Sequence, residues 1–200
     1  IAQSGGTYDE FKLAIISTFG FNSTVSPEEF KIKKLNDLTN QLYSEVNTYY
    51  NKRSKEIHEK MLPVLKDIHL NRGATVTNVI APFSDGKRQL GITLDLKKAI
   101  SADSSEVKYA LERYISIGIM DMGWKEHLRD MDDLKQSVHN AVFEQKDPLL
   151  VYKFEGFELF KKFITKINID IITFIFKAEL ANRDAEQVSE ARSNDQRREK

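Results

Sequence analysis

Residues 124–176 carry a hydrophobic pattern that predicts two helices. Apolar side chains recur there every three or four positions, which is the spacing of one face of an α-helix. The first stripe consists of Trp124, Leu128, Met131, Leu134 or Lys135, Val138 and Val142. The second consists of Phe154, Phe157, Ile164, Ile167, Ile171 and Phe174 or Ile175. We expect each stripe to be the buried side of its helix, with Trp124, the only tryptophan, as a core anchor.

The connection between these helices is short. The periodicity stops at Phe143-Glu144-Gln145-Lys146 and resumes after Asp147-Pro148. An aspartate accepts hydrogen bonds from the free N–H groups of a first helical turn, and proline at the first helical position removes no donor that the helix needs. Helices joined by so short a connection run antiparallel. The sequence therefore predicts a helical hairpin with residues 143–146 at its tip, where Phe143 is a candidate binding residue.

The first third of the chain is also predicted to be helical. Apolar residues four positions apart indicate a short helix over residues 8–19, which Gly20 ends. Ser26-Pro27-Glu28-Glu29 is a helix start, because the serine and the second glutamate form the two halves of a capping box. From there we expect one long helix that ends near Arg72-Gly73. Pro63 lies inside it and predicts a kink or a break just before that residue.

From Thr75 the hydrophobic period changes from about 3.6 residues to 2. Leucine and isoleucine alternate with small or polar residues up to Leu96, and Ser84-Asp85-Gly86-Lys87 supplies a turn in which glycine adopts positive φ. These signals predict a β-hairpin over about residues 75–96, which needs cover because an isolated two-stranded hairpin is marginally stable in water. Asp103-Ser104-Ser105-Glu106 is a second capping box, and it begins the helix that leads into Trp124.

The composition excludes several classes of protein. With 200 residues, 40% of them hydrophobic, the chain is long enough for one large or two small globular domains. Thirty basic and thirty acidic residues cancel, so no global field attracts nucleic acid, and we expect no nucleic-acid partner. No segment approaches the roughly 20 apolar residues of a membrane span. We expect residues 1–6 and the charged tail, residues 181–200, to be disordered.

The sequence predicts no catalytic, metal or cofactor site. The absence of cysteine excludes disulfides, thiolate catalysis and cysteine zinc sites. His58, His69, His127 and His139 lack the one-turn spacing that places two metal ligands on one helical face. No glycine-rich phosphate loop of Walker type occurs, so we expect no ATP site. No serine stands in a nucleophile context, and we expect no enzymatic activity of the chain alone.

The predicted hairpin resembles a known family. WKEHL from Trp124, MD-x-L from Met131 and QKDPL-x-x-YK-x-E-x-F from Gln145 are similar to the C-terminal part of SecA, the motor of bacterial preprotein translocation. In that family this stretch is the two-helix finger, whose tip enters the mouth of the SecY channel. The resemblance implies that the tip contacts the preprotein through Phe143, Glu144, Gln145 and Lys146. It implies that the finger is packed by Trp124, Leu128, Met131, Val138, Tyr152 and Phe157. Phe143 aligns with a position that is commonly tyrosine, so no hydroxyl is available there.

The resemblance also implies a domain organisation and a mechanical function. Residues 7–102 would form a helical wing-like domain with the β-hairpin, and residues 103–180 a helical scaffold with the finger. The finger would couple ATP-driven movements of motor domains elsewhere in a longer parent protein to preprotein passage through SecY. ATP and Mg²⁺ would be bound by those motor domains. The chain begins at Ile1, and we expect it to be a fragment of that cytoplasmic protein, which is peripheral at the cytoplasmic face of the inner membrane.

A second hypothesis remains open. The chain would then be a stand-alone helical scaffold that self-associates through the apolar residues of 154–176. A motor fragment should bind translocon components or unfolded chains, whereas a scaffold should bind a folded partner. Both hypotheses predict the same fold class, which is mainly α, with long antiparallel helices that include a helical hairpin and with a small β-hairpin inserted between helices.

Overall fold

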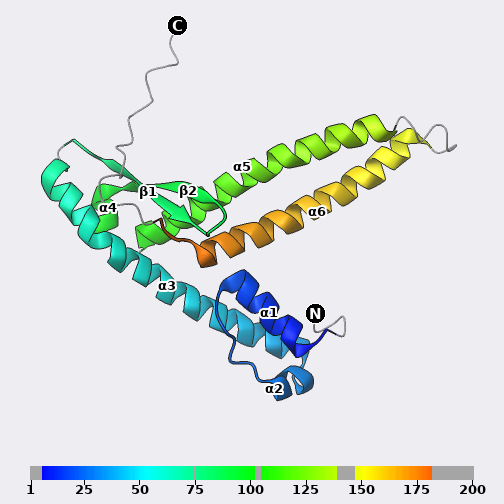
Figure 1. Ribbon diagram of the computed structural model, residues 1–200, viewed down its shortest axis with the longest axis horizontal. Coiled ribbons are helices and arrows are strands. Elements are labelled where there is room, and N and C mark those ends of the chain that lie inside the picture. The colour runs from blue at the N-terminus through cyan, green and yellow to red at the C-terminus, as the bar shows by residue number, and fades with distance from the viewer. Residues whose placement is uncertain (1–5, 74, 102–104, 139–146, 182–200) are drawn as a thin grey trace, which may run out of the picture. The chain divides into compact units, whose positions relative to one another are not determined.

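The computed structural model describes residues 6–73, 75–101, 105–138 and 147–181. They form a mainly helical fold with one small antiparallel sheet (Figure 1). The helices are α1 (Tyr8–Phe19), α2 (Pro27–Ile32), α3 (Leu35–Arg72), α4 (Leu96–Ser101), α5 (Ser105–Ser137) and α6 (Pro148–Lys177). The strands are β1 (Asn78–Ser84), β2 (Gln89–Asp95) and β3 (Glu179–Leu180). The predicted fold class is therefore confirmed, whereas the disorder predicted at the two ends falls almost entirely outside the described residues.

The chain divides into two compact units. The first unit is Ile1–Tyr114 with Thr173–Lys200, and the second, which we call the hairpin unit, is Ile115–Ile172. α5 and α6 each contribute residues to both units. The predicted division into a wing-like domain and a scaffold at residues 102 and 103 is a different partition, and it stays a prediction. Among the described helices, none has the length and hydropathy that a membrane span needs.

The helix signals at the start of the chain are largely confirmed. α1 covers the predicted residues and ends at Gly20, whose φ of 75° is the left-handed conformation that glycine adopts without strain. Ser26 and Glu29 form the predicted capping box. The prediction of one long helix from this start is wrong, because α2 ends at Ile32. Lys33 then adopts an extended backbone, and its Nζ donates to Glu29 Oε1 at 2.6 Å.

Of the kink or break predicted near Lys60 to Leu62, the break does not occur, since α3 runs through Pro63 to Arg72, and the kink stays a prediction. Proline removes one helical hydrogen bond and crowds the preceding turn. Ile57, Met61 and Leu65 are buried on either side of it, and tertiary packing of this face supplies most of the stability of the helix. The second predicted capping box lies partly outside the described residues, and α5 begins at its Ser105.

The predicted β-hairpin is confirmed, with one change at its end. β1 and β2 pair antiparallel from Asn78↔Asp95 to Ser84↔Gln89. In the loop, Asp85 Oδ1 accepts hydrogen bonds from the N–H groups of Lys87 at 2.8 Å and Arg88 at 2.6 Å. Leu96, predicted as strand, instead begins α4, because Asp95 Oδ1 accepts the free N–H of Lys98 at 3.0 Å and so caps that helix.

A third strand was missed by the sequence analysis. β3 pairs with the end of β1 through Phe83↔Leu180 and Ser84↔Glu179. The Ala181 N–H donates to the Pro82 carbonyl at 3.0 Å, and the Arg53 guanidinium donates to the Ala178 carbonyl at 2.6 Å. Two residues carry no hydrophobic period, so nothing in the local sequence distinguishes this strand from a loop.

The last turn of α6 lies in the aromatic core of the first unit. Phe174 is fully buried, and the Phe176 ring lies 5.1 Å from Phe19 and 5.3 Å from Tyr50. The Tyr50 hydroxyl donates to Glu112 Oε1 at 2.7 Å, which ties α3 to the first turns of α5. Burial, together with this carboxylate, raises the pKa of Tyr50 far above its ordinary value, so the phenol stays a donor. The first unit therefore holds both the beginning of α5 and the end of α6.

The loop before α2 is fastened to α3 by one carboxylate. Glu45 accepts hydrogen bonds from the Ser23 hydroxyl at 2.6 Å, from the Thr24 N–H at 3.2 Å and hydroxyl, and from the Gln41 amide at 3.3 Å. Partial burial raises the pKa of Glu45, but these donors outweigh it and hold the pKa below its ordinary value of 4.5.

We expect Glu45→Ala to destabilise the chain by about 1 kcal/mol, at the low end for charge-assisted hydrogen bonds because the group is partly exposed. Since the folded pKa lies below the unfolded one, this contribution is present above pH 4.5 and is lost as the pH falls through the folded pKa. Urea unfolding from pH 7 to pH 3 measures it, with the exposed Glu59→Ala as control. An unchanged free energy of unfolding at pH 7 would contradict the assignment.

Candidate functional site

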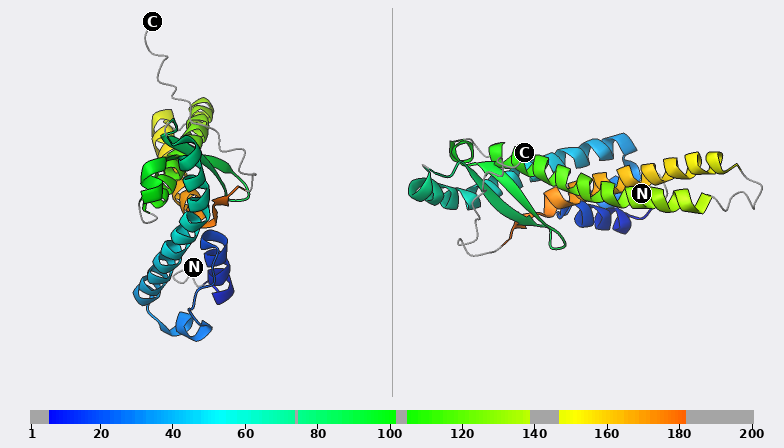
Figure 2. Two further views of the ribbon diagram at one scale, coloured as in Figure 1. Left: turned by 90° about the vertical axis from the view of Figure 1, so that its left-hand side faces the viewer. Right: turned by 90° about the horizontal axis from the view of Figure 1, so that it is seen from above.

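The hairpin unit contains the predicted finger. Within it α5 and α6 lie side by side and antiparallel (Figures 1 and 2). α6 begins at Pro148 as predicted, and Asp147 Oδ1 accepts the Leu149 N–H at 2.8 Å. The predicted tip residues Phe143, Glu144, Gln145 and Lys146 lie outside the described residues. Their role stays a prediction.

Two glycines lie where the facing helix leaves little room for a side chain. A Cβ added to Gly123 would lie 3.2 Å from Ile167 Cγ1 and 3.4 Å from Phe163 Cε2. A Cβ added to Gly156 would lie 3.2 Å from the terminal methyl of Met131. The side chains buried along the same line are Ile119, His127, Leu134, Val138 and Ile167. The contact between α5 and α6 is therefore built from small, aliphatic and aromatic groups.

His127 is at the centre of an aromatic cluster that the sequence analysis did not identify. It is 6% exposed, and its ring stacks on Phe163 at 4.7 Å with an interplanar angle of 15°. The centroid of the His127 ring lies 5.6 Å from that of Trp124 and 6.0 Å from that of Phe160. Within the described parts of the chain, His127 Nδ1 has no hydrogen-bond partner. The signal that was available is the spacing Ile119, Gly123, His127, which places the histidine on the buried line of α5.

The predicted packing residues are only partly buried. Val138 is buried and Met131 and Tyr152 are half-buried, but Trp124 is 46%, Leu128 47% and Phe157 60% exposed. The expectation that Trp124 is a core anchor is therefore wrong, since nearly half of its side chain is exposed. Trp124 and Leu128 each follow a residue of the buried line by one position, which turns them by about 100° from the contact with α6. Whether these six residues act in the finger as the resemblance implies stays a prediction.

Large apolar side chains gather on one side of the hairpin. In an antiparallel pair, residues that follow the contact line by one position turn to the same side on both helices. This side, which we call the apolar side, consists of Met120, Trp124 and Leu128 from α5 and Leu150, Phe157 and Ile164 from α6, all between 40% and 60% exposed. The opposite side carries charged residues and the exposed Met122. There Lys166 Nζ lies 2.6 Å from Glu126 Oε2, and this hydrogen bond raises the pKa of Lys166.

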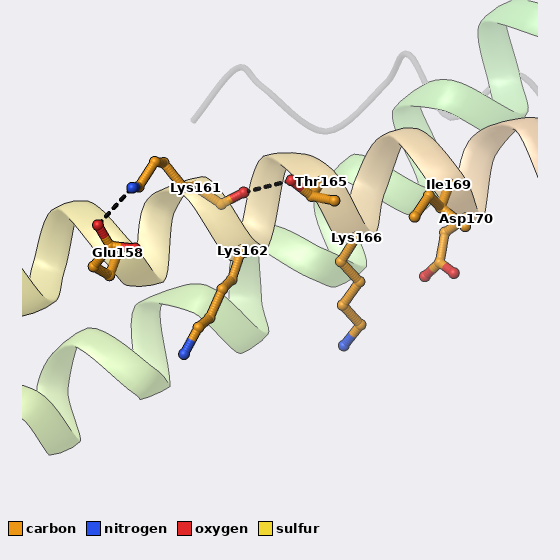
Figure 3. A pocket seen from close by; sticks show the side chains of 7 residues that line it. All are labelled: Glu158, Lys161, Lys162, Thr165, Lys166, Ile169 and Asp170. Carbon is orange, nitrogen blue, oxygen red and sulfur yellow. Dashed lines mark hydrogen bonds and ion pairs between the residues drawn. The ribbon is translucent and has the colours of Figure 1, made fainter. Parts of the chain in front are cut away.

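The exposed surface of α6 carries an open groove. It is lined by Glu158, Lys161, Lys162, Thr165, Lys166, Ile169 and Asp170 (Figure 3). Lys161 pairs with Glu158, and the Thr165 hydroxyl donates to the Lys161 carbonyl at 2.9 Å. All seven residues belong to one helix, and over the described ranges no group of His, Cys, Asp or Glu side chains is placed to hold a metal ion. This groove is the solvated face of an amphipathic helix.

Comparisons with known proteins identify the relatives of the chain. The family model described as the SecA wing and scaffold domain matches residues 5–179. A protein translocase subunit SecA from Cytophaga hutchinsonii is 47% identical over 189 residues, 94% of this chain and 17% of the relative. The corresponding subunit from Christiangramia forsetii is 38% identical over 185 residues, 92% of this chain and 16% of the relative. The chain thus spans less than a fifth of their length. No solved structure matches it significantly.

We expect Gly123→Ala and Gly156→Ala to have opposite effects on stability. Each replacement gains about 1 kcal/mol of helix propensity. At Gly156 the new methyl meets the flexible end of Met131, which moves easily, so the variant should be as stable as the parent or more stable. At Gly123 it meets Ile167 and the stacked Phe163, and overpacking typically costs about 1–3 kcal/mol. Urea unfolding of both variants measures the two changes in the free energy of unfolding. Equal changes would contradict the described contact between α5 and α6.

Proposed function

Because the chain belongs to the SecA family, as its wing and scaffold domain, we propose that it is the mechanical output element of a protein-translocating motor. The observation that carries the proposal is the continuity of two helices. α5 runs unbroken past Tyr114 and α6 runs unbroken past Ile172, so both helices of the hairpin unit continue into the first unit. An α-helix resists bending over a few turns because every backbone group is hydrogen-bonded along its axis. A displacement of the first unit would therefore reach the hairpin through both of its helices.

Both helix ends are held firmly where they enter the first unit. The start of α5 is held by the bond between Tyr50 and Glu112, and the end of α6 by the buried Phe174 and the aromatic contacts of Phe176. β3 and the bond from Arg53 to the Ala178 carbonyl hold the residues that follow. In the proposed mechanism motor domains elsewhere in the full-length protein bind ATP and Mg²⁺, and the first unit passes their movement to the hairpin.

The proposed partners are an unfolded preprotein and the SecY channel. The segment between α5 and α6, with Phe143, Glu144, Gln145 and Lys146, would meet the preprotein at the mouth of the channel. The full-length protein would work in the cytoplasm, peripheral to the inner membrane. This chain would supply no nucleotide site and no catalytic group of its own.

The apolar side of the hairpin favours a second candidate function, self-association of a helical scaffold. Trp124, Leu128 and Phe157 are each about half exposed. Exposed apolar patches beyond about 300–600 Å² usually mark interaction surfaces. In a longer protein, other segments would cover this side. The isolated chain lacks them, so we expect it to cover the side with another copy.

We expect the isolated chain to gain mass with concentration, and the double substitution Leu128→Ser with Phe157→Ser to lower that association. Both side chains lie on the apolar side and are already about half in water, so the fold should survive. Sedimentation from micromolar to millimolar concentration measures the effect. Lys162→Ser, on the polar groove of the same hairpin, is the matched control. Equal association of both variants and the parent would remove the apolar side from consideration.

We expect Phe143→Ala in the full-length parent to block preprotein translocation while the fold and the basal ATPase are kept. The sequence analysis places Phe143 at the tip of the predicted hairpin, so the stability change should be that of a surface substitution, about 0.5 kcal/mol or less. A bulky ring suits nonspecific contact with side chains that vary along a moving polypeptide, so Phe143→Tyr should be tolerated. Preprotein uptake into reconstituted vesicles is the measurement.

Two results would count against this assignment. Uptake at the parental rate by the alanine variant would end the mechanical role of the segment. A melting temperature several degrees lower would show that Phe143 is a core residue and that the hairpin tip is drawn in the wrong place.

A further inference from the structure

The outer edge of β2 presents unpaired backbone groups. The Leu96 N–H donates to the Thr77 carbonyl and the Asp85 N–H donates to the Arg88 carbonyl, which fixes the even-numbered residues of β2 as those bonded to β1. The N–H and C=O groups of Gln89, Gly91 and Thr93 therefore point away from β1. The sheet order is β2-β1-β3, so no strand among the described residues pairs with this edge.

This edge lacks the usual features that prevent strand addition. Natural sheets protect their edges with lysine, proline or a bulge. Between Gln89 and Asp95 there is no lysine or proline, and the register with β1 is continuous, without a bulge. The other edge of the sheet has Pro82, which has no N–H, and is partly covered by β3. Gln89 and Gly91 are both exposed.

We propose that the outer edge of β2 pairs with the same edge of a second copy of this chain, antiparallel and centred on Gly91. The two-fold axis can pass through any residue of the strand, but only odd-numbered residues exchange hydrogen bonds across it, because their N–H and C=O groups point outward. With Gly91 as the centre, Gln89 lies opposite Thr93 of the second copy, and each such pair exchanges two main-chain hydrogen bonds. Gly91 lies opposite itself, so no side chains meet at the two-fold axis.

Charge complementarity selects this register over its neighbours. With Gly91 as the centre, the loop residue Lys87, two positions before β2 begins at Gln89, comes level with Asp95 of the other copy, so the dimer pairs each of two lysines with an aspartate. A centre at Gln89, Leu90, Ile92 or Thr93 leaves both residues without these partners. Lys87 is exposed, and its ammonium forms no ion pair with another described residue. Asp95 uses Oδ1 to cap α4, and its other carboxylate oxygen remains for the lysine.

This pairing does not depend on the proposed translocation function or on the apolar side of the hairpin. Its surface lies on β2, in the first unit, whereas the apolar side lies wholly in the hairpin unit. The two surfaces are therefore separable by substitution, and either one can fail without the other.

Cysteine cross-linking of the full 200-residue chain tests the register. The chain has no native cysteine, so only the introduced cysteines can form disulfides. One preparation carries Gln89→Cys and the other Thr93→Cys. Opposed residues have Cα atoms about 5.5 Å apart, within the range of a disulfide. We expect rapid disulfide formation in the mixture. Each variant alone should cross-link poorly, since two copies of residue 89 would be about 14 Å apart. Equal cross-linking in all three samples, or none in any, would overturn the proposal.

Two further measurements separate backbone pairing from charge. Thr93→Pro removes an outward N–H that β1 does not use and should abolish dimerisation through this edge, whereas Thr93→Val should keep it. Lys87→Glu or Asp95→Lys alone should weaken the dimer about tenfold, and mixing these two variants should restore it. Circular dichroism checks that each variant is folded.

Three results would reject the proposal. In the background of Leu128→Ser with Phe157→Ser, which lowers association through the apolar side, dimerisation that Thr93→Pro leaves unchanged would exclude the edge. No recovery in the charge-swap mixture would exclude the register. Capture of an extended cysteine-containing peptide by Gln89→Cys, in a chain that stays monomeric, would assign the edge to peptides instead of to a second copy.

Discussion

The structure depends on the burial of the last turn of α6 in the core of the first unit. Phe174 is fully buried there, and Phe176 joins rings from α1 and α3, so residues more than 120 positions apart share one core. Aromatic side chains bury about 150–250 Å² each, which makes such a cluster a strong anchor. Without it, the chain after α6 would not reach β1, and β3 would have no partner. The hairpin unit is consequently an insertion between two segments of the first unit.

The hairpin unit is held together differently, by a close contact between two helices. Gly123 and Gly156 let α5 and α6 approach closely, so the contact line is narrow and contains His127 instead of the larger Trp124. The bulky residues next to this line are left on one side, half in water. A two-helix unit has too little interior to bury them, since a helix pair covers only one stripe of each partner. This surplus of apolar surface connects the packing of the hairpin to the expectation that it works against other molecules or other segments.

The two units also use polar groups in different ways. In the first unit, carboxylates fix loops and helix starts, as Glu45 does for residues 23 and 24 and Asp95 does for α4. In the hairpin unit, the ion pair of Lys166 with Glu126 joins two exposed helices and is worth little in water. The first unit is therefore the more firmly specified of the two, which suits the role proposed for it in holding both ends of the hairpin.

The sequence by itself determined what depends on neighbours along the chain. The capping box at Ser26, the glycine that ends α1, the turn at Asp85-Gly86 and the helix start at Asp147-Pro148 are local hydrogen-bonding and steric preferences, and each lies where it was predicted. The motif from Trp124 also indicated the family. Only the tertiary structure decided that α3 continues through Pro63, that α2 and α3 are separate, that two residues after α6 form a strand, and that His127 rather than Trp124 is buried. For Pro63, β3 and His127 the outcome depends on side chains far away in the sequence, and a hydrophobic period cannot show which of two adjacent helical faces finds a partner.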